Sequence, residues 1–235
     1  MTWFNFLKKD VVIHCYTSHA GVFNLAPIQK ATAFMPNWWK ELPKNGTDPQ
    51  HGFPIATMKG CAGLTDLYKY GFIMPIWSDV FLKIGKVGTV EYFYKFSDGM
   101  SKMTQHNTYQ RGSAYPDTSY QHLKIESPWV LECDEEINFM QTETFWNKEC
   151  PESMLIMPGI QNFKYQHGTN VNTLWVRKEQ EQEHFLNFGS PLVQFTPLTE
   201  RDVRLELHLV SVEEQHKRHS IAYKSTFINK YRSNK

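Results

Sequence analysis

Six polar side chains have the chemistry of catalytic groups and lie in or near one long polar stretch, residues 100–123. Connections of that length without a strand or helix pattern are uncommon unless they have a function. Carboxylates, imidazoles, phenols and guanidiniums transfer protons or bind anions in enzyme sites. Our candidate catalytic residues lie in this stretch or in the segments expected to support it, and they are Asp66, Asp79, His106, Tyr109, Arg111 and His122.

No local motif assigns the chain to an enzyme class. The phosphate-binding loop G-x-x-x-x-G-K-[ST], the nucleophile elbow G-x-S-x-G and the zinc motif H-E-x-x-H are all absent. No histidine begins an H-x-[DE] or H-x-H triplet, which would be the local pair of a facial-triad iron site. Any active site must therefore assemble from distant segments, and we predict no cofactor and no metal.

One histidine pair has a spacing that a metal ion could use. His216 and His219 lie three residues apart on an expected helix, so they could share one face. Lys217 and Arg218 between them disfavour a cation, and we interpret both histidines as solvated surface residues.

Aromatic residues, 14% of the chain, suggest a binding surface instead. Their usual role is core packing, but they are also enriched at the centres of protein interfaces. Prolines frame the segment that contains the first tryptophan pair, and such stiffness lowers the entropy cost of binding. We expect an apolar platform with residues 100–123 at its rim, although core packing explains Trp77 slightly better. The candidate binding residues are Trp38, Trp39, Trp77, Tyr115 and Tyr120.

The elements that would position these side chains are mostly strands. Alternating apolar residues predict a hairpin over 79–96 and a long strand over 202–212. On the latter strand Leu205 and Leu207 should be largely buried. Its opposite, polar face carries Arg204, Glu206 and His208.

Helical signals are short until the end of the chain. An apolar stripe predicts a helix near 62–70, with Gly71 as a C-terminal stop. Prolines exclude long helices from 26–54, where one helical turn at 36–43 could lay both tryptophans on the body. Asn45-Gly46 has the composition of a turn.

The C-terminal segment 214–235 predicts an amphipathic helix. From His216 onward it contains lysines and arginines but no acidic residue, and its apolar residues recur at helical spacing. Helices that bind nucleic acid or a membrane surface share this composition. We favour a helix docked by its apolar face with its basic face in solvent. This segment is the only part of the chain through which nucleic acid could bind, and we expect no membrane partner.

Length and composition fit one β-rich domain spanning residues 1–235. Of the 235 residues, 41% are hydrophobic and 21% charged, which is typical of a globular protein. A net charge of +1 argues against a broad nucleic-acid surface. The N-terminus has no signal-peptide pattern and no apolar run could span a membrane, so we expect a cytoplasmic protein with reduced thiols.

Two blocks of sequence resemble a known family. The first runs from Pro36-Asn37-Trp38-Trp39 through Thr57-Met58-Lys59-Gly60-Cys61 to Gly71-Phe72-Ile73-Met74-Pro75. The second includes Ser127-Pro128-Trp129 and Gly189-Ser190-Pro191. In this order they resemble an uncharacterised protein family of tailed bacteriophages, marine ones especially, and some bacteria. The resemblance spans roughly residues 30–200 and implies a phage origin, with no activity to carry over.

The second block also resembles the dUTPase-type β-clip. Its Gly-x-x-[Ile/Leu]-[Ala/Val]-Gln-[Leu/Phe] strand is matched by Gly189, Leu192, Val193, Gln194 and Phe195. The Pro-Arg-Ser-Gly phosphate loop and the Gly-rich C-terminal arm of that family are absent. The resemblance therefore concerns the fold and does not imply nucleotide hydrolysis.

Together these patterns predict a mainly β fold, a sandwich or β-clip-like barrel, with the two helices described above. The function that we expect is binding by a phage-encoded protein, as a structural or assembly component or as a modulator of a host protein. Its partner would be a phage or host protein or a second copy of the chain, in the host cytoplasm or on the virion. The alternative is an enzyme of jelly-roll or β-clip type, directed at nucleotides or small molecules, with a non-local active site.

Overall fold

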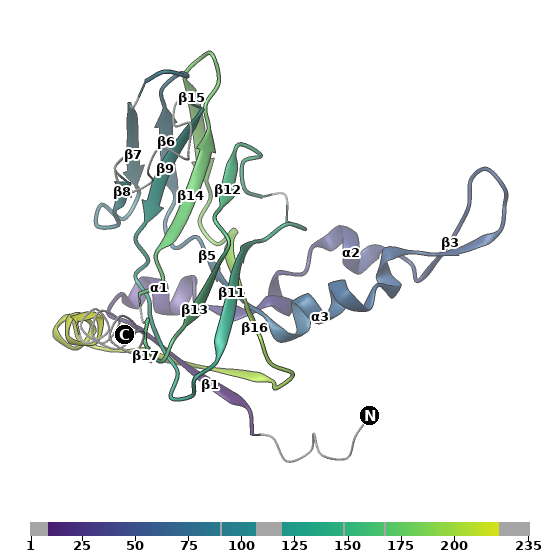
Figure 1. Ribbon diagram of the computed structural model, residues 1–235, viewed down its shortest axis with the longest axis horizontal. Helices are drawn as coiled ribbons and strands as arrows, with labels where there is room; N and C mark the ends of the chain where they lie inside the picture. Colours follow the sequence, from purple (N-terminus) through teal and green to yellow (C-terminus); the bar gives the residue numbers. More distant parts are fainter. Residues whose placement is uncertain (1–8, 90, 107–118, 148, 167, 221–235) are drawn as a thin grey trace, which may run out of the picture.

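The protein is mainly β: of the residues that the structure describes, 41% lie in strands and 18% in helices. The computed structural model in Figure 1 describes residues 9–89, 91–106, 119–147, 149–166 and 168–220. The described strands form several mostly antiparallel sheets and no closed barrel. The expected fold class, including the helix near 62–70 and the C-terminal helix, is thus confirmed. Among these residues no helix has both the length and the apolar character needed to cross a membrane.

The elements are short and many. In chain order the strands are β1 (Val11–Thr17), β2 (Gln29–Lys30), β3 (Asn45–Thr47), β4 (Pro54–Ala56), β5 (Phe72–Pro75), β6 (Val80–Ile84), β7 (Tyr92–Phe96), β8 (Met103–Gln105), β9 (Tyr120–Ile125), β10 (Val130–Glu132), β11 (Asn138–Glu143), β12 (Met154–Ile156), β13 (Gly159–Asn162), β14 (Val171–Val176), β15 (Gln182–Leu186), β16 (Pro191–Pro197) and β17 (Val203–Leu209). The helices are α1 (Ala20–Leu25), α2 (Asn37–Glu41) and α3 (Ala62–Tyr70), with the 3-10 turns η2 (Ala31–Phe34) and η3 (Met58–Gly60). The C-terminal helix is described over residues 212–220.

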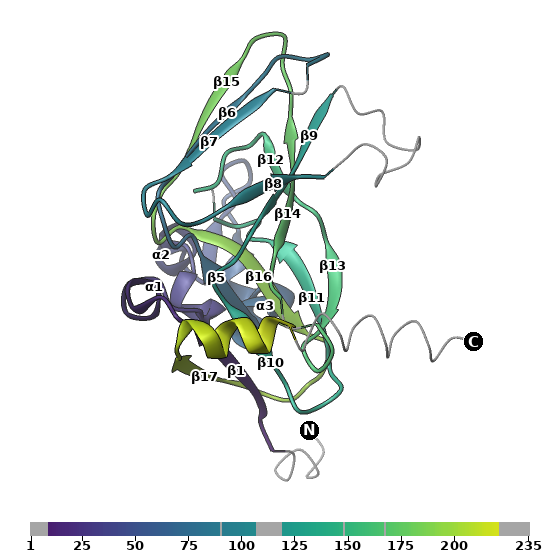
Figure 2. The ribbon, with the colours of Figure 1, turned by 90° about the vertical axis from the view of Figure 1, so that its left-hand side faces the viewer.

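Two sheets pack face to face in the upper part of Figure 2, with strand orders β15-β6-β7 and β12-β14-β9-β8. The hairpin expected over 79–96 is the β6–β7 pair. Alternation puts Leu82 of β6 and Leu123 of β9 into the main core, where both are fully buried. Between the sheets the rings of Trp175 and His184 lie 5.0 Å apart.

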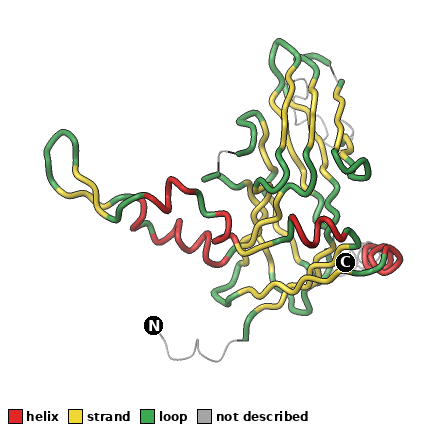
Figure 3. Tube along the Cα trace, turned by 180° about the vertical axis from the view of Figure 1, so that it is seen from behind, coloured by secondary structure: helices red, strands yellow, loops and turns green. Residues whose placement is uncertain are grey.

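A five-stranded sheet of order β13-β11-β16-β5-β2 lies below them and separates two cores. On one face, Phe72, Phe139 and Phe195 belong to the main core. On the other face Ile73 packs with Tyr68 of α3 in the smaller core. Figure 3 shows α2 and α3 side by side, with the hairpin β3–β4 extending beyond them.

That hairpin corrects one local expectation. Asn45 and Gly46 are not a turn but the first residues of β3, paired with Ala56 and Ile55 of β4. The turn lies between the strands, where Asp48 Oδ1 accepts backbone N–H groups from the next residues. Aspartate side chains commonly stabilise turns by accepting hydrogen bonds from the backbone that follows them, so the bend forms at Asp48 and the Asn-Gly pair is left in the strand.

The first and last strands of the described chain meet in the sheet of order β10-β1-β17. β1 pairs with β10 antiparallel and with β17 parallel. The inner side chains of β1, such as Ile13 and Cys15, are fully buried. Leu205 and Leu207 pack against the main core but are only partly buried, contrary to expectation, because β17 is the edge strand of this sheet.

Candidate functional site

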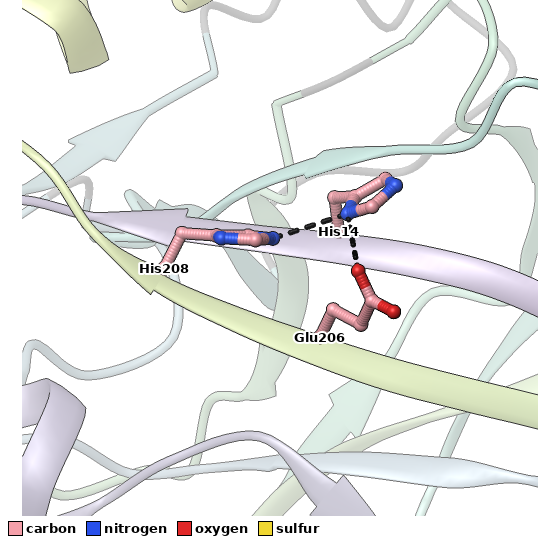
Figure 4. Close-up of side chains that lie close together, drawn as sticks. All are labelled: His14, Glu206 and His208. Atoms are coloured by element: carbon pink, nitrogen blue, oxygen red, sulfur yellow. Dashed lines mark hydrogen bonds and ion pairs between the residues drawn. The ribbon is translucent and has the colours of Figure 1, made fainter.

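Three side chains that could bind a metal ion or exchange a proton meet on the outer face of β1 and β17 (Figure 4). His14 lies directly opposite Glu206 in the parallel pair, and His208 follows two residues later on the same face. His14 Nδ1 is 3.0 Å from His208 Nε2 and 3.2 Å from Glu206 Oε2. We call these three residues the His14 cluster. All three are half-buried, so solvent reaches the cluster.

Neighbouring side chains orient the cluster. The Tyr16 ring stacks on His208 with centroids 4.6 Å apart, and the guanidinium of Arg218 lies 3.8 Å from the centre of the Tyr16 ring. Arg218 in turn binds Glu132 at 2.7 Å and Glu214 at 2.8 Å. Burial is the main reason that the pKa of His208 is lowered from its ordinary value. Its ring is therefore neutral near pH 7 and has a lone pair to offer.

The sequence analysis missed this cluster because its parts form no searchable motif. The pair on β17 reads Glu-x-His, the reverse of the His-x-[DE] order that marks a facial triad. The remaining ligand, His14, is 194 residues away from His208. The only signal was the alternation of the last strand, which placed Glu206 and His208 on one polar face.

Two of the candidate catalytic residues do lie against each other. The rings of His106 and His122 stack with centroids 4.3 Å apart and planes inclined by 26°. His106 Nε2 is 2.9 Å from Asn172 Oδ1 in β14, a contact in which the ring N–H donates to the amide oxygen. His122 is buried in β9, and His106 directly follows β8. The arrangement is an imidazole pair with one ring held by an amide.

The other candidates lie on different elements or outside the described residues. Asp66 is exposed on α3. Asp79 Oδ1 accepts the backbone N–H of Phe188 at 2.7 Å, which ties two loops together. Three further candidates fall outside the residues that the structure describes: Tyr109, Arg111 and Tyr115.

The tryptophans divide between surface and core. Trp38 is 42% exposed and donates its indole N–H to the backbone oxygen of Trp146 at 3.2 Å. Trp39 and Trp77 are buried, at 9% and 4% exposure, in the smaller and the main core respectively. Tyr120 is half-buried at the start of β9. Of the three tryptophans only Trp38 has a broad accessible face.

An apolar surface with side chains more exposed than Trp38 lies on the outer face of β15-β6-β7, at the top of Figure 1. The ring of Phe81 lies 5.1 Å from that of Phe185 and 6.2 Å from that of Phe93. Phe93 is 56% exposed and Phe185 63%. We call these three residues the phenylalanine face. No sequence pattern singled it out, because each phenylalanine alone fits an ordinary strand position.

His216 and His219 line an open depression together with His19 and Glu126. Both histidines lie on the described part of the C-terminal helix. Of the segment 214–235, residues 221–235 lie outside the described residues, so its basic, aromatic half is not placed. Among the described residues, the His14 cluster is the group of three or more metal-ligating side chains that converge closely enough to share an ion.

Comparisons with known proteins add no assignment. No protein-family model matches the chain, and neither a curated protein nor a solved structure matches it. The function must therefore be argued from the geometry of these surfaces.

Proposed function

We propose that this protein works by binding, and that the phenylalanine face joins two copies of the chain. The observation that carries the proposal is an aromatic cluster on the outer face of a sheet whose inner face is already buried. Outer positions of a solvated antiparallel strand are normally polar. A contiguous exposed apolar surface is the usual mark of an interaction site.

Charges around the phenylalanine face favour a second copy as the partner. Across the three strands the outer positions read Phe185–Phe81–Lys95 in one row and Glu183–Lys83–Phe93 in the next. The rings are thus bordered by both signs of charge, and Lys83 already binds Glu181 at 2.7 Å. A two-fold contact presents the same surface from both sides, so a face with both signs can complement itself. Aromatic centres with polar rims are typical of such interfaces.

In this proposal the protein is a structural or assembly component that self-associates. The resemblance to a phage family supports that role as well as the assignment to a phage, because phage assemblies are built from repeated copies. Modulation of a host protein would require a partner other than a second copy.

Sedimentation equilibrium tests the proposal directly. We expect the full chain to approach twice its 27.6 kDa mass as its concentration rises. The double substitution Phe93→Glu, Phe185→Glu should return it to the monomer mass, because two like charges would face their own copies across the contact. Both side chains are exposed, so the fold should tolerate the change.

Phe53→Glu is the matched control, since Phe53 is 55% exposed but lies in the β3–β4 hairpin. It should leave the mass unchanged. A wild-type chain that stays monomeric at the highest concentration would contradict the proposal, and so would a double variant that associates like the wild type. Circular dichroism of all variants checks that the fold is retained.

A second candidate function is an enzyme with a non-local site, and the stacked pair His106 and His122 favours it. An imidazole pair held by Asn172 could relay a proton to a bound nucleotide or small molecule. Binding of a nucleoside triphosphate should then raise the melting temperature, and His106→Ala should remove the shift. Identical melting curves with and without nucleotide would count against a nucleotide-directed enzyme.

A further inference from the structure

We propose that the His14 cluster binds a first-row divalent transition-metal ion through His14 Nδ1, His208 Nε2 and Glu206 Oε2. The site lies on β1 and β17 and does not depend on the phenylalanine face. It would be a metal centre built from the first and the last strand of the fold.

The spacing of the ligand atoms fits a shared coordination sphere. Two donor atoms that each lie about 2.1 Å from one ion are about 3.0–3.4 Å apart. The contacts of His14 Nδ1 with His208 Nε2 and Glu206 Oε2 are 3.0 Å and 3.2 Å. All three atoms lie within 4.8 Å of one another and come from one face of two paired strands. Two of the three separations therefore match a coordination sphere without an ion, and the pairing of β1 with β17 places all three side chains on one face.

Hydrogen bonding alone leaves this arrangement poorly satisfied. His14 Nδ1 has either one proton or one lone pair, yet two groups approach it at hydrogen-bonding distance. When Nδ1 is protonated, a single N–H is divided between His208 and Glu206. When Nδ1 is unprotonated, its lone pair faces the carboxylate. A cation at the meeting point would allow all three atoms to use their lone pairs at once.

The donor types select the class of metal. Two imidazoles and one carboxylate are the ligands that Zn²⁺, Fe²⁺, Co²⁺ and related ions prefer, whereas Ca²⁺ and Mg²⁺ prefer oxygen ligands throughout. Three protein ligands leave at least one position for water. The half-buried side chains admit that water, since His14 and Glu206 have side-chain exposures of 26% and 33%.

Charged side chains from β17, β10 and the C-terminal helix surround the His14 cluster. Glu206 Oε1 binds Arg204 at 3.0 Å, which leaves Oε2 directed at His14. Arg218 from the C-terminal helix approaches through Tyr16, but it is neutralised by Glu132 and Glu214. Three carboxylates, those of Glu206, Glu132 and Glu214, therefore outweigh the two guanidiniums around the cluster, and the balance favours a divalent cation.

An ion at this place would also fasten β17 to β1. β17 is an edge strand whose inner leucines are only partly buried, so its attachment to the sheet depends mainly on its pairing with β1. Because a ligand that binds only the folded state stabilises it by mass action, added metal should raise the melting temperature.

Titration of the chelator-treated full chain with Zn²⁺ and Co²⁺ tests the proposal. We expect one Zn²⁺ per chain by calorimetry, visible absorption bands from bound Co²⁺, and a higher melting temperature with Zn²⁺. His14→Ala and His208→Ala should each weaken Zn²⁺ binding at least roughly tenfold, since even second-shell changes cost that much at metal sites. Glu206→Gln preserves the shape of the side chain but removes its charge, and it should weaken binding as well.

His51→Ala is the matched control, because His51 is an exposed histidine that lies beside a single carboxylate, Asp48. It should bind Zn²⁺ like the wild type. Absence of stoichiometric Zn²⁺ binding to the wild-type chain would overturn the proposal without reference to any variant. Equal affinities of Glu206→Gln, His51→Ala and the wild type would exclude Glu206 as a ligand and overturn the proposal as well.

Discussion

At the scale of single residues, burial separates the reactivities of the cysteine thiols. Cys15, on the inner face of β1, is fully buried, and burial raises its pKa far above the usual range. Burial also raises the pKa of Cys150 to about 11. Cys61 is exposed, and none of the four cysteines forms a disulfide. Because the thiolate is the reactive form, buried thiols are protected by both access and ionisation.

Timed alkylation with iodoacetamide at pH 8 should therefore label Cys61 of the native protein first. Cys15 should stay unlabelled until the chain is unfolded in denaturant, and the half-buried Cys150 should react more slowly than Cys61 because its pKa is raised. Intact-mass spectrometry counts the labels, and Cys61→Ser should remove the fast one. Rapid labelling of Cys15 in the folded protein would contradict its burial. A reductant should leave the melting temperature unchanged.

His184 connects residue chemistry to stability. Its ring packs on Trp175 between two sheets, and burial, with a smaller contribution from Lys178, lowers its pKa. The unfolded chain, in which an imidazole titrates at about 6.5, then binds this proton more readily than the folded chain. The contribution of His184 to stability is present at pH 7 and is lost as the pH falls below about 6.5.

Urea denaturation at pH 7 and pH 5 tests whether His184 makes the protein less stable at the lower pH. The wild-type chain should lose more unfolding free energy between the two values than His184→Gln, which cannot titrate. His51→Gln changes an exposed histidine and should behave like the wild type. If the unfolding free energy of His184→Gln and of the wild type changed equally with pH, His184 would not contribute to the pH dependence of stability.

At the scale of elements, the end of α3 shows why a glycine is required there. The helix ends before Gly71, as expected, but Gly71 has φ −79° and ψ 168°, so it is extended and not in the left-handed conformation common for glycines that follow helices. Its lack of a side chain lets Gln194 and the end of α3 pack directly against its backbone. A Cβ at this position would lie 2.8 Å from Gln194 Nε2 and 2.9 Å from the backbone oxygen of Leu67.

Gly71→Ala should consequently destabilise the fold by about 1–3 kcal/mol, the usual cost of overpacking. Gly63→Ala is the control within the same helix, because a Cβ there meets nothing within 4 Å. That change should be neutral or stabilise by up to about 1 kcal/mol, as expected for alanine in a helix. Chemical denaturation measures both, and equal stabilities of the two variants would contradict the close approach.

Elements were the best-predicted level of the structure. The hairpin over 79–96 and the helix near 62–70 were recognised because their periodicity is local, and the strand that the Gly189-led block indicated contributes Leu192 to Phe195 of β16. Interactions outside the local pattern account for the errors. Asp48, and not Asn45-Gly46, forms the turn, while the edge position of β17 leaves Leu207 only partly buried.

At the scale of the whole molecule, the pairing of distant strands could not be predicted from the sequence. β1 and β17 pair in parallel although almost the whole chain separates them, and no residue pattern in either strand identifies the other as its partner. The His14 cluster exists only through that register. The phenylalanine face likewise needs β15 to join β6, although about a hundred residues separate them. The sequence shows which residue types could form a site, but only the strand topology shows which of these residues lie close together.

The same topology predicts how local stability varies over the molecule. β16 lies inside the five-stranded sheet, paired on both sides, and all but one of its seven residues are buried. β3 and β4 pair only with each other and contain no buried residue. Figure 1 shows that hairpin extending away from the sheets. Hydrogen bonds of this exposed kind open locally at little free-energy cost.

Hydrogen exchange followed by mass spectrometry should therefore show that peptides over residues 45–56, which contain β3 and β4, exchange much faster than peptides that contain β16. Peptides over 191–197 should exchange only through global unfolding. A low concentration of urea should speed exchange in β16 and leave the hairpin rate nearly unchanged, because local opening exposes little new surface. Comparable protection of the two segments would mean that the hairpin is covered in solution.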